Sequence, residues 1–302
     1  MRTVLLSGGT GGAKLARGLL DVADLTVVAN TGDDVEMYGA YVSPDPDLVT
    51  YWLTDAIDER GFGIRGDTWD VMGALEDAGE PVWFRLGDRD LAMCLIRTAR
   101  LRSGARLTEA HAAVVRAMGV AAPVLPMCDE PVSTHVLSAG RAVPFQEFMI
   151  VERAAAPVDG VELRGIGAAR PTPEVLEAIA AAEAIVIGPS NPVISIGPIL
   201  AVPGMREAVR DAPAPVVAVS PFVGGRSIKG PTEAFCAQAG IELSAAGVAR
   251  AYEGLVDGVV ADEPLHGLPA IETDTLMDSP ADRRRVAERT LDLARTLRGL
   301  SR

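Results

Sequence analysis

Short apolar runs alternate with segments of helical periodicity near both ends of the chain, which is the pattern of parallel strands joined by helices. Near the N-terminus we predict a strand over Thr3–Ser7, a helix from about Ala13 to Val22, and a second strand over Leu25–Asn30. A strand, a helix and a strand in this order indicate a parallel pair with a right-handed crossover.

The second half of the chain repeats the same alternation. Its predicted helices cover Pro173–Ala182, Pro203–Arg210, Pro231–Ala239 and Pro280–Leu297, and its predicted strands cover Ala184–Ile187, Pro215–Val219 and Gly258–Ala261. The expected fold class is therefore α/β, with one Rossmann-like domain over residues 1–302. Its sheet should be doubly wound, mostly parallel and built from both ends of the chain.

The middle of the chain follows a different pattern. From Pro46 to Val120 the periodicity is largely helical, with glycine and proline interruptions. Ser133–Leu137 and Ala142–Val151 are separated by a short turn segment and predict a β-hairpin. We therefore predict a largely helical insertion with a hairpin over about 55–170. It should cap the crevice at the carboxyl ends of the strands, where ligands bind in such sheets.

The composition is that of a folded globular protein, with 48% hydrophobic and 23% charged residues. Aromatic residues make up only 4%, so the core must rest on aliphatic side chains. The formal net charge is −13 and no basic stripe is present, which argues against nucleic acid as a partner. An acidic chain that binds an anionic ligand needs local donors, a helix N-terminus or a metal.

The cysteines and the N-terminus indicate a cytoplasmic protein. Cys94, Cys128 and Cys236 are far apart in sequence and form no C-x-x-C pair, as is usual in a reducing compartment. The sequence begins directly with the first predicted strand, and no signal peptide or membrane span precedes it. We therefore expect no membrane partner.

A glycine-rich segment joins the first predicted strand to the first predicted helix. It consists of Gly8, Gly9, Thr10, Gly11, Gly12, Ala13 and Lys14. Backbone N–H groups can converge on an anion at such a point, although a tight turn that packs the helix on the sheet is the alternative. Lys14 breaks the third glycine of the dinucleotide fingerprint, and Leu15 breaks the P-loop pattern. The segment therefore predicts phosphate binding without identifying the nucleotide.

Four aspartates, Asp33, Asp34, Asp45 and Asp47, follow the second predicted strand closely. Both segments leave the same strand end, so these carboxylates could meet near the glycine segment. Together they would repel one another unless a cation balanced them. Oxygen ligands favour Mg²⁺, which bridges protein carboxylates to substrate phosphates. The alternative is that the aspartates cap helices and turns.

Three further segments are candidates for ligand contact. Residues 83–90 combine aromatic and charged side chains around a glycine; they fit either a capped helix start or a planar ligand, with Arg89 the strongest contact. Residues 188–198 and 220–231 follow predicted strands on the ligand side of the sheet, where ordinary strand-end turns are the alternative. Lys229 in the last segment is a candidate phosphate partner. No Ser/His/Asp or H-E-x-x-H arrangement is present.

These segments, in this order, resemble the 2-phospho-L-lactate transferase family of coenzyme F420 biosynthesis, whose actinobacterial version is also described as a phosphoenolpyruvate transferase. The resemblance rests on LSGGTGGAKLARGL at 6–19, VVANTGDD at 27–34, SPDPD at 43–47, RLGDRDLA at 85–92, PFQEFMI at 144–150, GPSNPVISIGPIL at 188–200 and SPFVGGRSIKGP at 220–231. The chain departs from the family pattern at Ser43 and Leu48, where the family usually has Cys and Thr, and at Arg226, where many members have Lys.

The resemblance implies a reaction. A phospholactyl or phosphoenolpyruvyl group passes from a guanosine diphosphate-linked three-carbon acid to the ribityl hydroxyl of the deazaflavin FO, and GMP is released. The resemblance also implies Mg²⁺ and a homodimer, and it leaves open which of the two acids is used.

The resemblance further implies roles for individual residues. It assigns Asp33 and Asp47 to catalysis, and Asp33, Asp34, Asp45 and Asp47 to the metal. It assigns Gly8, Gly9, Thr10, Gly11, Gly12, Ala13, Lys14, Ser190, Asn191, Pro192, Ser195 and Lys229 to the nucleotide and its phosphates, and Asp45, Asp47, Asp88, Arg89 and Thr134 to FO. Since Asp47 would then line an open cleft, we expect Asp47→Ala to abolish transfer with little loss of folding.

Two other functions compete with this one. A related family of bacterial gluconeogenesis and cell-shape factors shares the glycine segment and binds UDP-sugars without catalysis, but the segments at 85–92 and 144–150 argue against it. An NAD(P)-dependent oxidoreductase is disfavoured by the broken third glycine and by the excess of carboxylates.

Overall fold

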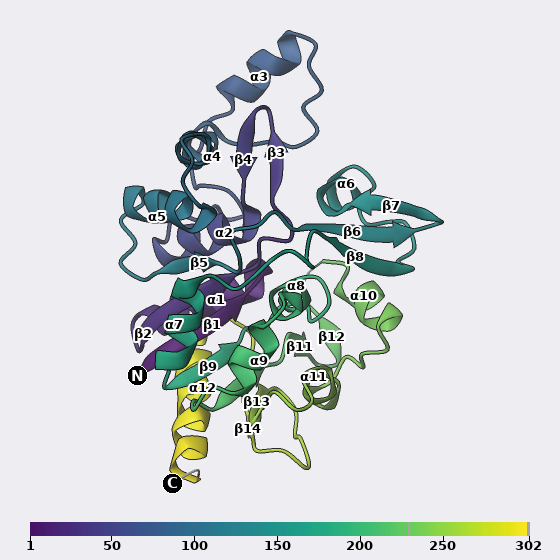
Figure 1. Cartoon of the computed structure of the whole chain (residues 1–302). Coiled ribbons are helices and arrows are strands. Elements are labelled where there is room, and N and C mark those ends of the chain that lie inside the picture. Colours follow the sequence, from purple (N-terminus) through teal and green to yellow (C-terminus); the bar gives the residue numbers. More distant parts are fainter. Residues whose placement is uncertain (229, 301–302) are drawn as a thin grey trace.

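A seven-stranded parallel sheet forms the centre of the computed structural model, which describes residues 1–228 and 230–300 (Figure 1). Its strands are β1 (Arg2–Ser7), β2 (Asp24–Ala29), β5 (Val124–Pro126), β9 (Ala184–Ile187), β10 (Val216–Val219), β13 (Gly258–Ala261) and β14 (Ala270–Glu272). They lie in the order β14-β13-β10-β9-β1-β2-β5, and every neighbouring pair is parallel. The predicted Rossmann-like α/β fold is confirmed.

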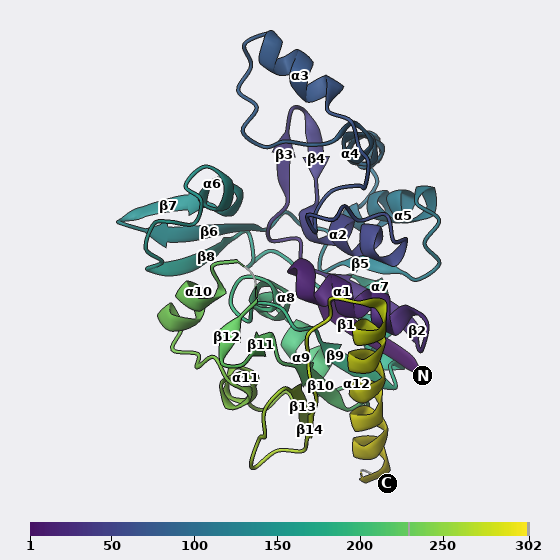
Figure 2. The same ribbon diagram turned by 180° about the vertical axis from the view of Figure 1, so that it is seen from behind.

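Helices cover both faces of this sheet (Figures 1 and 2). On one face lie α1 (Gly9–Leu20), α2 (Pro44–Leu53) and α12 (Pro280–Leu300), and on the other lie α7 (Pro173–Ala181), α8 (Ile196–Ala201), α9 (Met205–Arg210) and α11 (Ala245–Ala251). Successive strand residues point to opposite faces, so Leu5 packs into the first core and Leu6 into the second. Both side chains are fully buried, as expected for a parallel strand between two helical layers.

The order of the strands reverses between β1 and β9. From β1 the chain continues to β2 on one side, whereas β9 lies on the other side and leads to β10 and β13. Loops that leave the carboxyl ends of two such strands diverge and leave a crevice between them. The glycine segment follows β1 and residues 188–195 follow β9, so both border this crevice.

The remaining elements lie mostly above the main sheet in Figure 1. They comprise the hairpin β3 (Val35–Met37) and β4 (Ala40–Val42), the helices α3 (Asp70–Asp77), α4 (Asp88–Arg102) and α5 (Leu107–Ala117), the antiparallel sheet β6 (Ser133–Ser138), β7 (Arg141–Pro144) and β8 (Gly160–Arg164), and α6 (Phe145–Ile150). The short pair β11 (Phe222–Val223) and β12 (Arg226–Ser227) precedes α10 (Thr232–Gln238). The predicted insertion over about 55–170 does not stay outside the core, because β5 pairs with β2.

Several elements differ from the sequence prediction. The first helix begins at Gly9, inside the glycine segment, rather than at Ala13. The predicted strand Ala142–Val151 ends at Pro144 and continues as a helix, which buries Phe148. The elements β3, β4, β5, β8, α8 and α11 were not predicted, because three to seven residues are too few to establish a period. None of the described helices is both long enough and apolar enough to cross a membrane.

Candidate functional site

The glycine segment forms the first turn of α1 and lies against the loop that follows β9. A Cβ on Gly11 would stand 1.9 Å from the carbonyl oxygen of Pro189, and one on Gly12 would stand 2.4 Å from Ser7 Oγ. The Gly12 N–H donates to Ser190 Oγ at 3.1 Å. Glycine is therefore required at both positions for the helix to start this close to the second loop.

This contact predicts the effect of a single methyl group. Gly11→Ala should lower the melting temperature, because the methyl overlaps a backbone oxygen, and overpacking costs about 1–3 kcal/mol. Gly73→Ala in α3 is the matched control, since its Cβ would meet nothing within 4 Å. Thermal unfolding of the two variants tests the packing. An unchanged melting temperature for Gly11→Ala would mean that α1 and the β9 loop do not touch in this way.

The N-terminus of α1 presents donors to the crevice. Gly9 has a φ of +64° and its N–H donates to Asp45 Oδ1 at 2.7 Å. The N–H groups of Thr10 and Gly11 have no acceptor within the described residues, and the first turn of the helix carries no acidic side chain. Lys14 follows on the same helix and forms an ion pair with the exposed Asp278 at 3.0 Å. Free amides at a helix N-terminus beside a lysine favour binding of an anion.

Asn30, at the end of β2, joins two of the predicted aspartates. Its Nδ2 donates to Asp45 Oδ2 at 2.9 Å and to Asp33 Oδ2 at 3.2 Å, and its Oδ1 accepts from the Gly32 N–H. Burial raises the pKa of Asp45 to about 6. Burial, and then the charge of Asp45, raise the pKa of Asp33 well above its usual value. We call these two residues the Asp33–Asp45 pair.

The second oxygen of Asp33, Oδ1, is buried and accepts no hydrogen bond of good geometry from a described residue. The nearby Thr134 hydroxyl lowers the pKa of Asp33, but it does not offset the larger effects of burial and of the Asp45 charge. A buried carboxylate oxygen without a partner costs free energy, and the neighbouring carboxylate increases that cost. A hard divalent cation would relieve both costs, since carboxylate oxygens are its preferred ligands. The donor set of the Asp33–Asp45 pair therefore fits such an ion.

The other two predicted aspartates have different partners. Asp34 accepts hydrogen bonds from Ser43 Oγ at 2.8 Å and from the Tyr41 hydroxyl at 3.0 Å. Asp47 is only 4% exposed and forms a bidentate pair with the fully buried Arg97, with Nη1–Oδ1 at 2.7 Å. The structure thus separates the four carboxylates into the Asp33–Asp45 pair and two residues that already have partners.

No three of the four predicted metal ligands come within 4.8 Å of one another in the described chain. The described set that does meet this distance is Asp47, Asp90 and Cys94. Both oxygens of Asp47 are already engaged by Arg97, and Asp90 Oδ1 accepts from the Tyr51 hydroxyl at 2.7 Å. We therefore assign no metal to that set.

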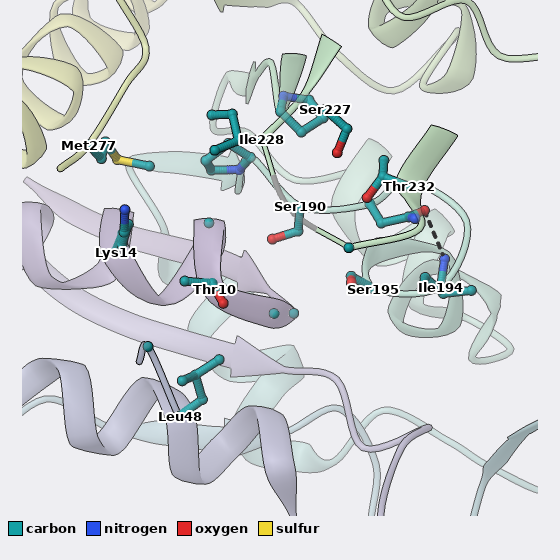
Figure 3. Close-up of a pocket in the computed structure, with 18 of the residues that line it drawn as sticks. Thr10, Lys14, Leu48, Ser190, Ile194, Ser195, Ser227, Ile228, Thr232 and Met277 are labelled. Carbon is teal, nitrogen blue, oxygen red and sulfur yellow. Dashed lines mark hydrogen bonds between the residues drawn. The ribbon is translucent and has the colours of Figure 1, made fainter. Parts of the chain in front are cut away.

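Two cavities open beside these residues. The first, about 580 Å³, lies along the start of α1, and we call it the glycine cavity. Figure 3 shows Thr10, Ser190 and Ser195 around it, from α1 and from the loop after β9, with Lys14 further along the helix. Backbone amides, hydroxyl groups and a lysine suit a phosphorylated ligand.

The second cavity, about 650 Å³, is lined by aromatic side chains, and we call it the aromatic cavity. The lining includes Tyr51, Phe62, Trp69, Trp83, Phe84 and Phe145. The whole sequence has only thirteen aromatic residues (six Phe, three Trp and four Tyr), so nearly half of them line this one space. Such a concentration favours a flat, aromatic ligand.

The two cavities adjoin. Leu48, Arg60, Phe62 and Met149 line both of them. The Asp33–Asp45 pair lies beside this junction, because its carboxylates line the aromatic cavity while Asp45 binds the N–H of Gly9, which lines the glycine cavity. A ligand in one cavity can therefore meet a ligand in the other close to these carboxylates.

The family model described as 2-phospho-L-lactate transferase CofD matches residues 3–290 of the chain. The chain belongs to this transferase family. A phosphoenolpyruvate transferase of Kitasatospora aureofaciens is 43% identical over 284 residues, which cover 90% of this chain and 88% of the relative. A 2-phospho-L-lactate transferase of Methanosarcina mazei is 40% identical over 298 residues, which cover 94% of this chain and 98% of the relative.

A protein of another named family, whose structure has been solved, shares the fold of this chain. It is a member of the UPF0052 family from Bacillus halodurans, with a TM-score of 0.62 and 19% sequence identity. The match covers 96% of this chain and 98% of that protein. At this identity the likeness concerns the architecture alone.

The structure places the other predicted ligand residues of this CofD-family member as follows. Asn191 Oδ1 accepts from the N–H groups of Val193 and Ile194 and so shapes the loop after β9, which also contains Pro192 and Ser195. Ser190 and Asn191 line the glycine cavity. Lys229 lies outside the described residues.

The residues predicted to bind FO fall into two groups. Asp45 and Asp47 line the aromatic cavity, and Thr134 is buried next to Gly32, beneath the Asp33 turn. Asp88 instead caps the start of α3, accepting from the N–H groups of residues 70 and 71, and Arg89 donates to the carbonyl of residue 65. Neither Asp88 nor Arg89 is among the residues that line the aromatic cavity.

Sequence reasoning missed three residues of the site. Asn30 was included only as the end of a strand. An asparagine at a strand end, three residues before an aspartate, is the signal that could have indicated an amide that donates to carboxylates. Arg97 carried no signal, because its partner Asp47 is fifty residues away in the sequence. Arg60 lies in a segment that reads as an ordinary glycine-rich turn.

Proposed function

We propose that this CofD-family chain transfers a phospholactyl or phosphoenolpyruvyl group from a guanosine diphosphate-linked donor to the ribityl hydroxyl of FO, releasing GMP, in coenzyme F420 biosynthesis. The observation that carries the proposal is the junction of two unlike cavities, one lined by amides and hydroxyls and the other by aromatic rings. The relatives in the family, a phosphoenolpyruvate transferase and a 2-phospho-L-lactate transferase, support the same reaction.

The glycine cavity suits the donor. Its diphosphate would lie at the N-terminus of α1, where the N–H groups of Thr10 and Gly11 are free of acceptors within the described residues and Lys14 adds a positive charge. These donors are fixed by the packing of α1 on the β9 loop, so they need little reorganisation as charge develops on the leaving phosphate.

The aromatic cavity suits FO, whose ring system is flat. Trp83 and Phe84 offer ring faces and edges for stacking, and Asp90 offers a hydrogen-bond acceptor to the ribityl chain. With the ring held there, the ribityl hydroxyl can reach the junction and attack the phosphorus nearer the acid. The oxygen–phosphorus bond to GMP then breaks, and the hydroxyl proton passes to a carboxylate of the cavity, a minor contribution in phosphoryl transfer.

Mg²⁺ is the cofactor that we propose for this reaction. The Asp33–Asp45 pair would hold it, because Asp33 Oδ1 is a buried oxygen without a hydrogen bond to any described residue and the two carboxylates share one amide. When bound, the ion would supply charge neutralisation for the diphosphate. Asp34 and Asp47 are not proposed as ligands, since Ser43 and Arg97 already occupy their oxygens.

Product analysis tests the function directly. The purified chain should be mixed with FO, Mg²⁺ and each of the two guanosine diphosphate-linked acids in turn, and the products examined by mass spectrometry. We expect a phosphodiester of FO and an equal amount of GMP with at least one donor. Absence of product with both donors, while the protein binds UDP-N-acetylglucosamine, would instead favour a UDP-sugar regulator. The family resemblance also supports a homodimer, which sedimentation would test.

A further inference from the structure

Arg60 lies at the junction of the two cavities and lines both of them. Within the described residues, the basic side chains that line the glycine cavity are Lys14 and Arg60, and those that line the aromatic cavity are Arg60 and Arg85. Arg60 is thus the described basic residue common to both. The other residues shared by the cavities, Leu48, Phe62 and Met149, are apolar, so Arg60 alone among the described shared residues can meet an anion.

The backbone around Arg60 is fixed by a tight turn. Ile57 and Ile64 form an isolated antiparallel bridge, the Asp58 N–H donates to the Gly63 carbonyl at 3.0 Å, and the Gly61 N–H donates to the Asp58 carbonyl at 2.8 Å. The bridge residues Ile57 and Ile64 are buried and anchor the turn in the core. The side chain of Arg60 therefore extends from a rigid base toward the junction.

Stacking on aromatic rings orients the guanidinium. Its central carbon lies 5.1 Å from the ring centre of Phe62 and 5.3 Å from that of Trp69. Its charged partner is Asp58, two residues away, at 2.6 Å, and the Arg60 side chain remains 47% exposed. An exposed ion pair of this kind contributes little, so an incoming carboxylate or phosphate can replace Asp58. The planar face is held by the rings while the N–H groups stay available.

We infer, on the basis of the proposed function, that Arg60 binds the carboxylate of the donor's three-carbon acid. The transferred group must lie where the two cavities meet, and this acid end is the part of the donor that enters the junction. Its carboxylate would be repelled there by the carboxylates of Asp33 and Asp45. A guanidinium can bind a carboxylate through two parallel N–H···O bonds, which neutralises this repulsion and fixes the acid's orientation.

Lys14 and Arg60 then bind different parts of the donor. The diphosphate is served by the amides at the start of α1 and by Lys14, whereas GDP has no carboxylate for Arg60. Loss of Arg60 should therefore weaken binding of the guanosine diphosphate-linked acid and leave GDP binding unchanged. Arg85 provides a matched control. Its guanidinium also lies over Trp69, at 5.7 Å, its side chain is 48% exposed, and it forms an ion pair with Glu76. Unlike Arg60, it lines the aromatic cavity but not the glycine cavity.

Calorimetric titration without FO tests the inference, because no transfer can occur. We expect Arg60→Gln to weaken donor binding at least tenfold, Arg60→Lys to restore part of the loss through its charge, and Arg85→Gln to match the wild type. Binding of GDP should be the same in all four proteins. Equal loss of GDP and donor binding in Arg60→Gln would place Arg60 on the phosphates and overturn the inference, as would donor binding that does not change.

The same titrations distinguish this inference from the proposed function. If the wild type binds neither GDP nor either donor, the donor assignment itself fails. If the wild type binds donor and forms product with FO, but Arg60→Gln binds donor as tightly as the wild type, the transferase proposal stands and the role of Arg60 is wrong.

Discussion

Asp33→Asn should abolish transfer and yet make the protein more stable at alkaline pH. The transfer rate should fall by at least about 100-fold, the usual cost of removing a group that stabilises charge in the transition state. The stability should rise because the variant removes a buried charge next to Asp45, with an oxygen that no described residue satisfies. A residue that lowers stability while supporting activity is expected in a functional site.

The pH dependence of this effect has a definite sign. The pKa of Asp33 in the folded protein lies well above 3.8, its ordinary value, because of burial first and the charge of Asp45 second. The folded state therefore binds this proton more tightly than the unfolded state, and wild-type stability falls as the pH rises from about 4 through the folded pKa. Melting temperatures of wild type and Asp33→Asn should agree at pH 4 and diverge at pH 8, with the variant higher.

Mg²⁺ provides a readout that does not depend on catalysis. Added Mg²⁺ should raise the melting temperature of the wild type more at pH 8 than at pH 5, since the ion competes with protons for the Asp33–Asp45 pair. Asp33→Asn should lose most of this shift, and Asp292→Asn, on the exposed side of α12, should keep it. An Mg²⁺ shift of equal size in Asp33→Asn and the wild type would refute the metal assignment.

Local pattern and residue type were sufficient to predict the fold and the position of the glycine segment in it. The buried strands of the sheet are short apolar runs, and the glycine segment lies between such a strand and a helix, so its place at the carboxyl edge of the sheet follows from topology. The loop after β9 was predicted on the ligand side for the same reason, and Ser190 does contact α1.

The grouping of the aspartates could not be predicted, because it depends on where α2 begins, which is at Pro44 and not at Pro46. Asp45 and Asp47 lie in the first turn of α2, and side chains two residues apart on a helix point to different sides. Asp45 therefore faces Gly9 and Asn30, whereas Asp47 faces Arg97. The turn at residues 31–34, where the Asp34 N–H donates to the Thr31 carbonyl, similarly directs Asp33 and Asp34 to different partners.

The second large effect concerns the buried pair Asp47–Arg97. Because Asp47 is 4% exposed and its carboxylate pairs with the buried Arg97, we expect Asp47→Ala to lower folding stability, in contrast to the expectation from the sequence. Removing one partner of a buried ion pair leaves the other uncompensated, at a cost of about 3–5 kcal/mol. We expect Arg97→Met and Asp47→Ala each to lose this amount in urea or thermal unfolding.

The two single variants should differ in how their stability depends on pH. Burial raises the pKa of Asp47 to about 7 even though Arg97 opposes the shift, and Arg97→Met removes that opposition. The pKa of Asp47 in Arg97→Met should therefore lie above its wild-type value. The stability of this variant should go on falling as the pH rises above 7, because the folded state holds a proton that the unfolded state has lost. In the wild type, burial, and then the charge of Arg97, lower the pKa of His111, whose Nδ1 lies 4.0 Å from Asp47 Oδ1.

A double variant separates the pair from its surroundings. Asp47→Leu combined with Arg97→Met replaces both charges with apolar groups, which is often neutral in a buried site, so much of the lost stability should return. Transfer should not return with it, because Asp47 lines the aromatic cavity and its carboxylate would be gone. If Arg97→Met instead lowered the free energy of unfolding by less than about 1 kcal/mol, the pair would behave like an exposed salt bridge. The expectation that this pair stabilises the fold would then be refuted.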